Sequence, residues 1–262
     1  MSDNFRLTLA QLNPTVGALA ENAAIAHDAW EQGRDAGADL VALPEMFISG
    51  YQVQDLVMKP AFTADAMRHI EQLAVDCADG PALAIGGPFA DGDKLYNAYY
   101  ILQGGKITRR VLKHHLPNET VFDEKRLFDS AAPAGPYSIG NIRIGSPICE
   151  DAWHEDVAES LTETGAEILL IPNGSPYFRN KLDVRMNIMV ARVTENDLPL
   201  IYLNMVGGQD DQVFDGASFV LNPGGELAVL LPPFEEVVTA CRFHPRGRRL
   251  ARGQRRSGPT AG

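Results

Sequence analysis

The stretch IRIGSPICEDAWHEDVAESLTETGAEILLI, residues 142–171, decides the fold class of this chain. Its isoleucines at 142, 144 and 148 predict a strand that ends at Cys149. Residues 155–163 are helix-forming, and the apolar run ILLI at 168–171 predicts the next strand. Strand, helix and strand in succession indicate an α/β protein with a cysteine at the carboxyl end of a strand.

The same alternation extends over the rest of the chain. We expect further helices at 21–36, around 67–77 and along the apolar stripe 182–193. We expect further strands at 5–10, 40–43, 82–86, 95–102, 106–113, 200–203, 217–221 and 227–231. Gly104-Gly105 predicts a hairpin between two of them, so the sheet is mixed. The pattern fits two layers of sheet, or one mixed sheet with helices packed outside.

Length and charge limit the class of function. A chain of 262 residues suits one large α/β domain. The formal net charge of -11 argues against a general affinity for nucleic acid or anionic membranes, since both attract positive surfaces. No apolar run approaches the roughly 18–20 residues that span a bilayer, and the N-terminus lacks the features of an export signal. We therefore expect a cytoplasmic protein that acts on a small molecule.

The last twenty residues differ in composition from the rest. Residues 243–262 carry six arginines and no acid. We interpret 1–242 as the folded domain and 243–262 as a basic tail, either disordered or derived from a truncation. Aromatic residues that could stack on bases do not interleave with the arginines, which disfavours an RNA-binding arm.

The cysteines and histidines give little sign of a metal site. Cys77, Cys149 and Cys241 are too widely spaced for a disulfide framework or a CxxC metal site. His114 and His115 are neighbours in an extended stretch, so we expect their rings on opposite faces rather than around a shared ion.

Three reactive side chains follow apolar strands. Glu45 follows LVALP, Lys113 follows ITRRVL and Cys149 follows RIGSPI. The carboxyl ends of strands in α/β sheets are where ligands collect, so the three side chains are expected to meet over one pocket. The strand, sharp turn and helix around Cys149 resemble a nucleophile elbow.

These three residue types together suit acyl transfer. A cysteine attacks as the thiolate, which needs a neighbouring base and cation. Glu45 can accept the thiol proton and later donate it to departing ammonia. Lys113 and the backbone amide beside the nucleophile can stabilise the oxyanion. The hydrolysis step needs no metal and no cofactor on this interpretation.

The segments around these residues resemble the nitrilase superfamily of carbon-nitrogen hydrolases. The similar pieces, in order over residues 5–240, are LPEMFISGY, KHHLPNETVFDEKRLF, PICEDAW, NGSPY and VARVTENDLPLIYLN. HLPN before VFDEKRLF, together with CEDAW, is most similar to the glutaminase domain of glutamine-dependent NAD synthetases. The resemblance implies an αββα sandwich of two mixed sheets flanked by helices. It also implies that Glu45 is the general base, Lys113 the oxyanion-stabilising residue and Cys149 the nucleophile.

The resemblance further implies a substrate and a partner. Glutamine would become glutamate through a thioester, and the ammonia would pass to a synthetase domain or subunit. ATP and nicotinic acid adenine dinucleotide would be used only there, because the expected Ser-Gly-Gly-x-Asp-Ser loop is missing from this chain. Glutaminase domains of this kind pack against each other, which implies a homo-oligomer.

Motif positions suggest which residues bind glutamine. Tyr51, Glu150, Ser175 and Lys181 are the candidates, with Glu150 for the ammonium group, Ser175 for the polar head group and Lys181 for the carboxylate. Nitrilase relatives often use a second acid to orient the lysine. Glu119 and Glu124 compete for that role here, and Glu119 is preferred.

Two other functions fit the sequence. A stand-alone amidase, nitrilase or carbamoylase would act on another small C–N substrate and ignore the α-amino and α-carboxyl groups. A catalytically poor, truncated subunit would be folded but would lack a reactive Cys149.

Overall fold

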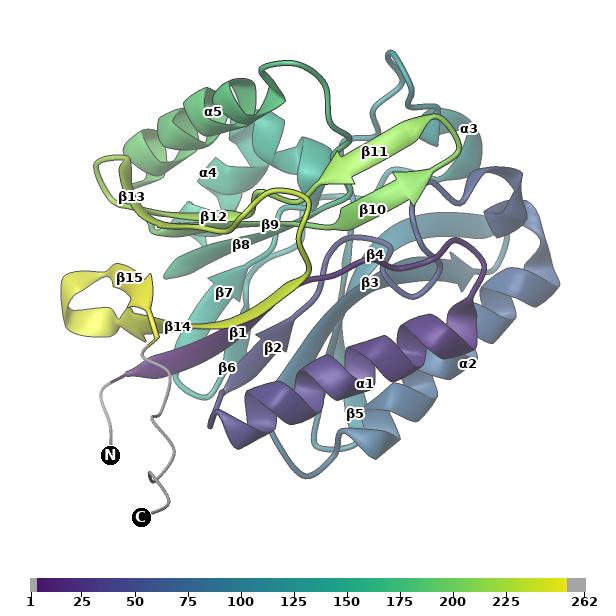
Figure 1. The fold of residues 1–262 in the computed structure, drawn as a ribbon, viewed down its shortest axis with the longest axis horizontal. Helices are drawn as coiled ribbons and strands as arrows, with labels where there is room; N and C mark the ends of the chain where they lie inside the picture. The colour runs from purple at the N-terminus through teal and green to yellow at the C-terminus, as the bar shows by residue number, and fades with distance from the viewer. Residues whose placement is uncertain (1–3, 254–262) are drawn as a thin grey trace.

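The computed structural model describes residues 4–253, which form two large sheets enclosed by helices. The first sheet has seven strands in the order β15-β14-β1-β2-β3-β4-β5, and the second has six in the order β13-β12-β9-β8-β7-β6. Helices α1 and α2 lie outside the first sheet, and α4 and α5 lie outside the second (Figure 1). The chain is therefore an αββα sandwich, as the family resemblance implies.

The first sheet is mixed. β1 (Phe5–Gln11), β2 (Leu40–Ala42) and β3 (Ala82–Asp91) pair in parallel, with α1 (Leu19–Asp35) and α2 (Pro60–Asp76) as the crossovers. β4 (Lys94–Gln103) and β5 (Lys106–Leu112) continue the sheet as an antiparallel hairpin. The hairpin predicted at Gly104-Gly105 is confirmed.

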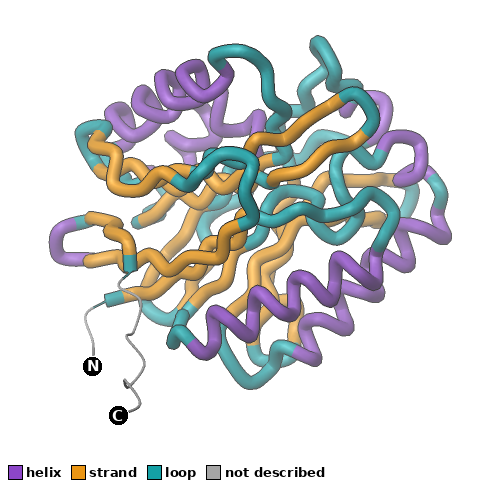
Figure 2. The backbone as a smooth tube through the Cα atoms, viewed as in Figure 1, coloured by secondary structure: helices purple, strands orange, loops and turns teal. Residues whose placement is uncertain are grey.

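The second sheet repeats this plan. β7 (Ile142–Gly145), β8 (Ile168–Asn173) and β9 (Leu200–Asn204) are parallel, and α4 (Glu155–Glu163) and α5 (Lys181–Asn196) connect them. β6 (Tyr137–Ile139), β12 (Phe219–Asn222) and β13 (Glu226–Leu230) extend the sheet in antiparallel pairs. Figure 2 shows the strands between the two groups of helices.

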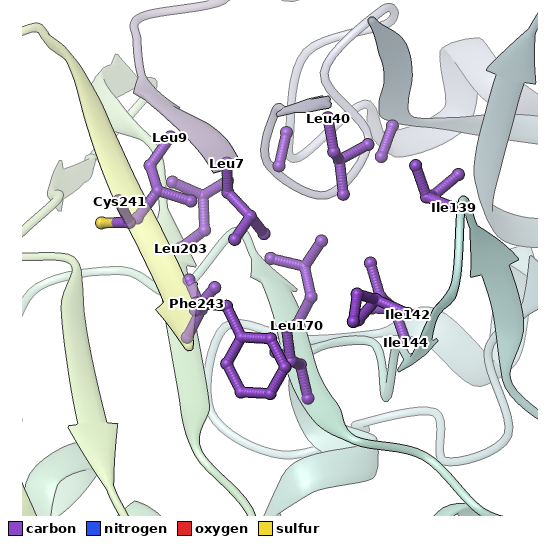
Figure 3. Close-up of a cluster of buried hydrophobic side chains, with 14 of the residues drawn as sticks. Leu7, Leu9, Leu40, Ile139, Ile142, Ile144, Leu170, Leu203, Cys241 and Phe243 are labelled. Carbon is purple, nitrogen blue, oxygen red and sulfur yellow. The ribbon is translucent and has the colours of Figure 1, made fainter. Parts of the chain in front are cut away.

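Alternation along the strands builds the layers. Leu7 and Leu9 of β1 pack between the two sheets, whereas Ala10 packs towards the helices. Figure 3 shows the layer between the sheets, where Leu7 meets Leu170 and Leu203 from the other sheet. This alternation gives each sheet two buried faces, one towards its helices and one towards the other sheet.

The predicted tail begins too early. β14 (Val237–His244) pairs with β1, and β15 (Arg249–Arg252) pairs with β14 after the 3₁₀ turn η3 (Pro245–Gly247). The prediction of disorder is wrong for residues 243–253, because Phe243 and Leu250 are buried in the layer between the sheets. Their arginine neighbours obscured that alternation in the sequence. The remainder of the predicted tail lies outside the described residues.

Candidate active site

Glu45 lies buried just after β2, where three donors hold its carboxylate. Oε1 accepts hydrogen bonds from Asn97 Nδ2 and Lys113 Nζ, both at 2.8 Å, and Oε2 accepts one from the Gly174 amide at 2.7 Å. The backbone of β3 comes close at Gly86. A Cβ there would lie 2.1 Å from the Met46 nitrogen, so only glycine permits this approach.

Lys113 directly follows β5 and is surrounded by acids. Its ammonium lies 2.8 Å from Glu45 Oε1 and 2.8 Å from Glu124 Oε2, and all three side chains are buried. Burial lowers the pKa of Lys113, but the charges of Glu124 and Glu45 outweigh that effect and raise it well above its ordinary value. The lysine is therefore a fixed cation.

Glu124 is the second acid in contact with this lysine. It begins the short helix α3 (Glu124–Leu127), and its Oε1 accepts hydrogen bonds from Tyr51 Oη at 2.8 Å and Asn97 Nδ2 at 3.2 Å. Burial raises the pKa of Glu124, although Lys113 opposes that shift. The preference for Glu119 in this role is wrong, because Glu119 is exposed and lies on the pocket lining instead.

Cys149 stands at the start of the 3₁₀ turn η2 (Cys149–Trp153). Its φ of 47° is in the left-handed region, which marks a sharp turn like the predicted elbow. β7 ends at Gly145, earlier than the predicted strand. Burial and the charge of Glu45 raise the pKa of the Cys149 thiol well above its ordinary value, while Lys113 lowers it. A raised pKa favours the thiol over the thiolate.

Asp151 connects the turn at Cys149 to the segment after Lys113. Its Oδ1 accepts hydrogen bonds from the amides of His114 at 3.1 Å and His115 at 2.7 Å, and its Oδ2 accepts one from the Ile148 amide at 3.0 Å. The carboxylate is buried. This contact was not predicted, because Asp151 reads in the sequence as an ordinary acid at the start of a helix.

The same contact overturns one expectation about the histidines. With both amides turned towards Asp151, the backbone at His114 and His115 does not follow the pleat of a strand. Their rings therefore lie on one side, with centroids 4.4 Å apart. The prediction that they point to opposite faces is wrong.

A second buried network supports the loop after β8. Arg185 of α5 is fully buried and forms an ion pair with Asp215 at 2.8 Å. It also donates to Ser175 Oγ at 3.1 Å and to the Ser175 carbonyl at 2.7 Å. No local pattern marks Arg185 for this role, since it falls within the predicted helix at 182–193 and its partner Asp215 is remote along the chain.

A pocket opens over Cys149, and three of the four predicted glutamine-binding residues line it: Glu150, Ser175 and Lys181. Glu119 also lines it. Lys181 lies over the rings of Trp153 at 4.3 Å and Phe178 at 4.5 Å. Burial and the positive charge of Arg185 lower its pKa. Tyr51 is buried behind the site with its hydroxyl on Glu124, so its predicted contact with substrate is not supported.

The other two cysteines lie elsewhere. Cys77 packs with the helices on the first sheet, and Cys241 packs between the sheets. Burial raises the pKa of each thiol to about 12. Cys149 thus differs from both in having an ammonium and a carboxylate whose charges act on it.

Comparison with known proteins shows the family to which the chain belongs. Residues 6–242 match the carbon-nitrogen hydrolase family. The chain belongs to this family, in agreement with its sandwich fold and with the acid, lysine and cysteine described above.

Two similar curated proteins are both glutamine-dependent NAD(+) synthetases. The chain is 62% identical over 238 residues to a glutamine-dependent NAD(+) synthetase of Rhodobacter capsulatus, covering 91% of this chain and 43% of that protein. A protein of the same name from Xylella fastidiosa is 38% identical over 231 residues, covering 87% of this chain and 42% of that protein. The chain thus spans less than half the length of these curated relatives.

Solved structures give the same fold. A glutamine-dependent NAD+ synthetase from Acinetobacter baumannii matches with a TM-score of 0.90 and 29% identity, covering 99% of this chain and 49% of that one. The amidase from Nesterenkonia sp. AN1 matches with a TM-score of 0.81 and 22% identity, covering 93% and 92%. The amidase supports the fold alone. Within residues 4–253, no helix combines the length and apolar character needed to cross a membrane.

Proposed function

We propose that this chain is a glutamine amidohydrolase, which converts glutamine to glutamate and ammonia through a thioester on Cys149. One observation carries the proposal: a buried lysine lies between two buried acids, and the charges of all three act on Cys149, which lines a pocket. The 62% identity to a glutamine-dependent NAD(+) synthetase supports glutamine as the amide.

The attack step uses all three predicted catalytic residues. Glu45 takes the proton of the Cys149 thiol as sulfur forms a bond to the carboxamide carbon. The carbonyl oxygen then carries negative charge, which the Lys113 ammonium and the backbone amide after Cys149 stabilise. The raised pKa of Cys149 favours this coupled transfer over a standing thiolate.

Collapse of the intermediate releases ammonia. Protonated Glu45 donates to the leaving nitrogen as the C–N bond breaks, which leaves a thioester on Cys149. Glu45 then takes a proton from water as the water oxygen attacks the thioester carbon. The C–S bond breaks, and Glu45 returns the proton to sulfur, which frees glutamate and restores the Cys149 thiol. No step needs a cofactor bound to this chain.

Charges on the pocket suit the two ends of an amino acid. Glu150 offers a carboxylate to the α-ammonium group, and Lys181 offers an ammonium to the α-carboxylate. Ser175 lies between Arg185 and the pocket, and its hydroxyl can contact the polar head group. Because Glu150 and Lys181 would bind the two charged groups of glutamine, the pocket would bind glutamine more tightly than an amide that lacks those groups.

The ammonia suggests a partner. We propose that a synthetase domain or subunit consumes it, and that ATP and nicotinic acid adenine dinucleotide bind only there. The chain length relative to its relatives supports this division. We further propose a cytoplasmic homo-oligomer that binds neither nucleic acid nor membrane, in keeping with the net charge of -11.

Ammonia release tests the proposal. The native chain should form ammonia from L-glutamine, and Cys149→Ala should lose at least about 1000-fold in kcat because the nucleophile is gone. Equal rates for the two proteins would end the proposal. A folded Cys149→Ala variant, checked by circular dichroism, separates loss of chemistry from loss of structure.

A substrate panel separates glutamine from the alternatives. Glutamine should exceed 4-carboxybutanamide and butanamide in kcat/KM, because these lack one or both charged groups of the amino-acid end. Equal values would indicate a stand-alone amidase. A folded chain that hydrolyses no amide and keeps Cys149 unreactive would indicate a catalytically poor subunit.

A further inference from the structure

Three side chains with metal-binding atoms converge at the rim of the pocket over Cys149. His114 and His115 follow Lys113, and Asp156 lies in the first turn of α4. His115 Nε2 is 2.9 Å from Asp156 Oδ1, and His114 Nε2 is 3.7 Å from Asp156 Oδ2. One donor atom from each residue lies within 4.8 Å of the other two. The mechanism proposed above uses none of these side chains.

Hydrogen bonds fix this arrangement before any ligand arrives. His114 Nδ1 lies 2.5 Å from the Ala131 carbonyl oxygen, and only a ring N–H can satisfy that acceptor. In the neutral ring the lone pair is then on Nε2, the atom that faces Asp156. A histidine whose other nitrogen donates to a carbonyl is typical of metal ligands. The bonds to Asp151 fix the backbone of both histidines as well.

The spacing suits a small divalent transition metal. Ligands at about 2.0–2.2 Å in a tetrahedral arrangement lie roughly 3.3 Å from one another. Asp156 Oδ2 lies 3.0 Å from His115 Nε2 and 3.7 Å from His114 Nε2, and these two separations fall on either side of that value. Two imidazoles and one carboxylate favour Zn²⁺ over Mg²⁺ or Ca²⁺, which prefer oxygen ligands.

We propose that His114, His115 and Asp156 form a Zn²⁺ site at the mouth of the pocket, and that a bound ion inhibits hydrolysis there. The inhibitory effect rests on the proposed function, whereas the binding site does not. His114, His115 and Cys149 line the same pocket, so an ion at the rim restricts access to the sulfur. Lys113 precedes His114 directly, so the ion also constrains the residue beside the oxyanion.

Direct binding tests the site. Untagged, chelator-treated protein is titrated with Zn²⁺ by calorimetry and with Co²⁺ by visible absorbance. We expect one ion per chain, with affinity lowered on the order of 100-fold in Asp156→Asn and in a His114→Gln/His115→Gln double variant. Circular dichroism of the metal-free variants checks that they fold.

Two control variants locate the ion. Cys149→Ala should keep the binding, since the thiol is not a proposed ligand. His27→Gln should also keep it, because His27 belongs to a separate cluster with Asp28 and Glu31 on α1. Absence of stoichiometric binding, or its loss in either control, would overturn the site.

Ammonia release in the presence of Zn²⁺ tests the inhibition. We expect the native chain to lose activity as the site fills, and Asp156→Asn to need on the order of 100-fold more Zn²⁺ for the same loss. Equal sensitivity would overturn the inhibitory effect. Zn²⁺ binding without any glutaminase activity would instead contradict the proposed function and leave the site intact.

Discussion

Lys113 is the residue on which the electrostatics of the site depend. It separates two buried acids, each 2.8 Å from its ammonium. Removing one member of a buried ion pair commonly costs about 3–5 kcal/mol, because the remaining charge has no partner. A structural role for Lys113 therefore accompanies its proposed chemical one.

A Lys113→Met variant should lose stability in a pH-dependent way. Glu124 has a raised pKa in the folded state, and such a group favours folding at low pH and opposes it as pH rises. Without the lysine that pKa rises further, so the stability loss should reach about 3–5 kcal/mol at pH 8 and be smaller at pH 5.5. Urea unfolding of both proteins at both pH values measures it. Equal losses would contradict this account.

The two rival acids should behave differently. Glu124→Gln removes a charge that contacts Lys113, so we expect kcat to fall by roughly 100-fold or more. Glu119→Gln alters an exposed carboxylate on the pocket lining, so we expect less than about a tenfold change, mainly in KM. Steady-state ammonia release measures both. A larger fall in kcat for Glu119→Gln than for Glu124→Gln would instead favour Glu119 as the acid that orients Lys113.

Among elements, the contact between η2 and the end of β5 matters most. Asp151 is the shared acceptor, so Asp151→Asn should disturb the relative position of Cys149 and Lys113. A small displacement of reacting groups can cost about 100-fold in rate, so we expect kcat to fall by about 10- to 100-fold with KM little changed. Rescue by Asp151→Glu is not expected, because the longer side chain misplaces the acceptors. An unchanged kcat in Asp151→Asn would refute this role.

β15 provides a test of whether the chain after residue 242 belongs to the folded core. Leu250 is buried between the sheets, and its amide and carbonyl bond to Asn222 on β12. Leu250→Ala should lower the free energy of unfolding by about 2–5 kcal/mol, as core truncations do. Urea denaturation checks it, with Ala251→Ser on the exposed neighbour as the control. A decrease in the free energy of unfolding below about 0.5 kcal/mol would indicate that residues 243–253 are not part of the folded core.

How far the sequence predicts the elements depends on local pattern. Alternation and turn glycines predicted β1, the β4–β5 hairpin and the helices, because those signals are local. The hairpin of β10 (Val206–Gln209) and β11 (Gln212–Asp215) was missed, since VGGQ carries no apolar alternation. The αββα layers needed the family resemblance, because pattern alone does not choose between one sheet and two.

The residues of the site, like the elements, divide into those that a local sequence pattern marks and those that only the tertiary structure brings together. The strand-end pattern made Glu45, Lys113 and Cys149 candidates, and the family resemblance supplied the roles predicted for them. Glu124 lies in a stretch without periodicity, so its contact with Lys113 was decided only by tertiary structure. Asp151, Arg185 and Asn97 act through partners far away along the chain, and no local pattern marks such residues.

For the whole molecule, the two sheets bring residues that are remote in sequence to one buried site, of which Cys149 lines the pocket. Glu45 and Lys113 come from the first sheet, whereas Cys149 and Gly174 come from the second. The Gly174 amide bonds to Glu45 across the sandwich. The site therefore depends on how the sheets pack together through the buried layer between them.

Covalent labelling tests most directly whether this packing produces a reactive cysteine. The native chain is treated with a glutamine-mimicking diazoketone and digested, and mass spectrometry identifies the modified residue. We predict one adduct per chain on Cys149, slowed by added L-glutamine and greatly reduced in Lys113→Met. An adduct on Cys77 or Cys241 in preference to Cys149, or labelling that glutamine does not slow, would contradict the account.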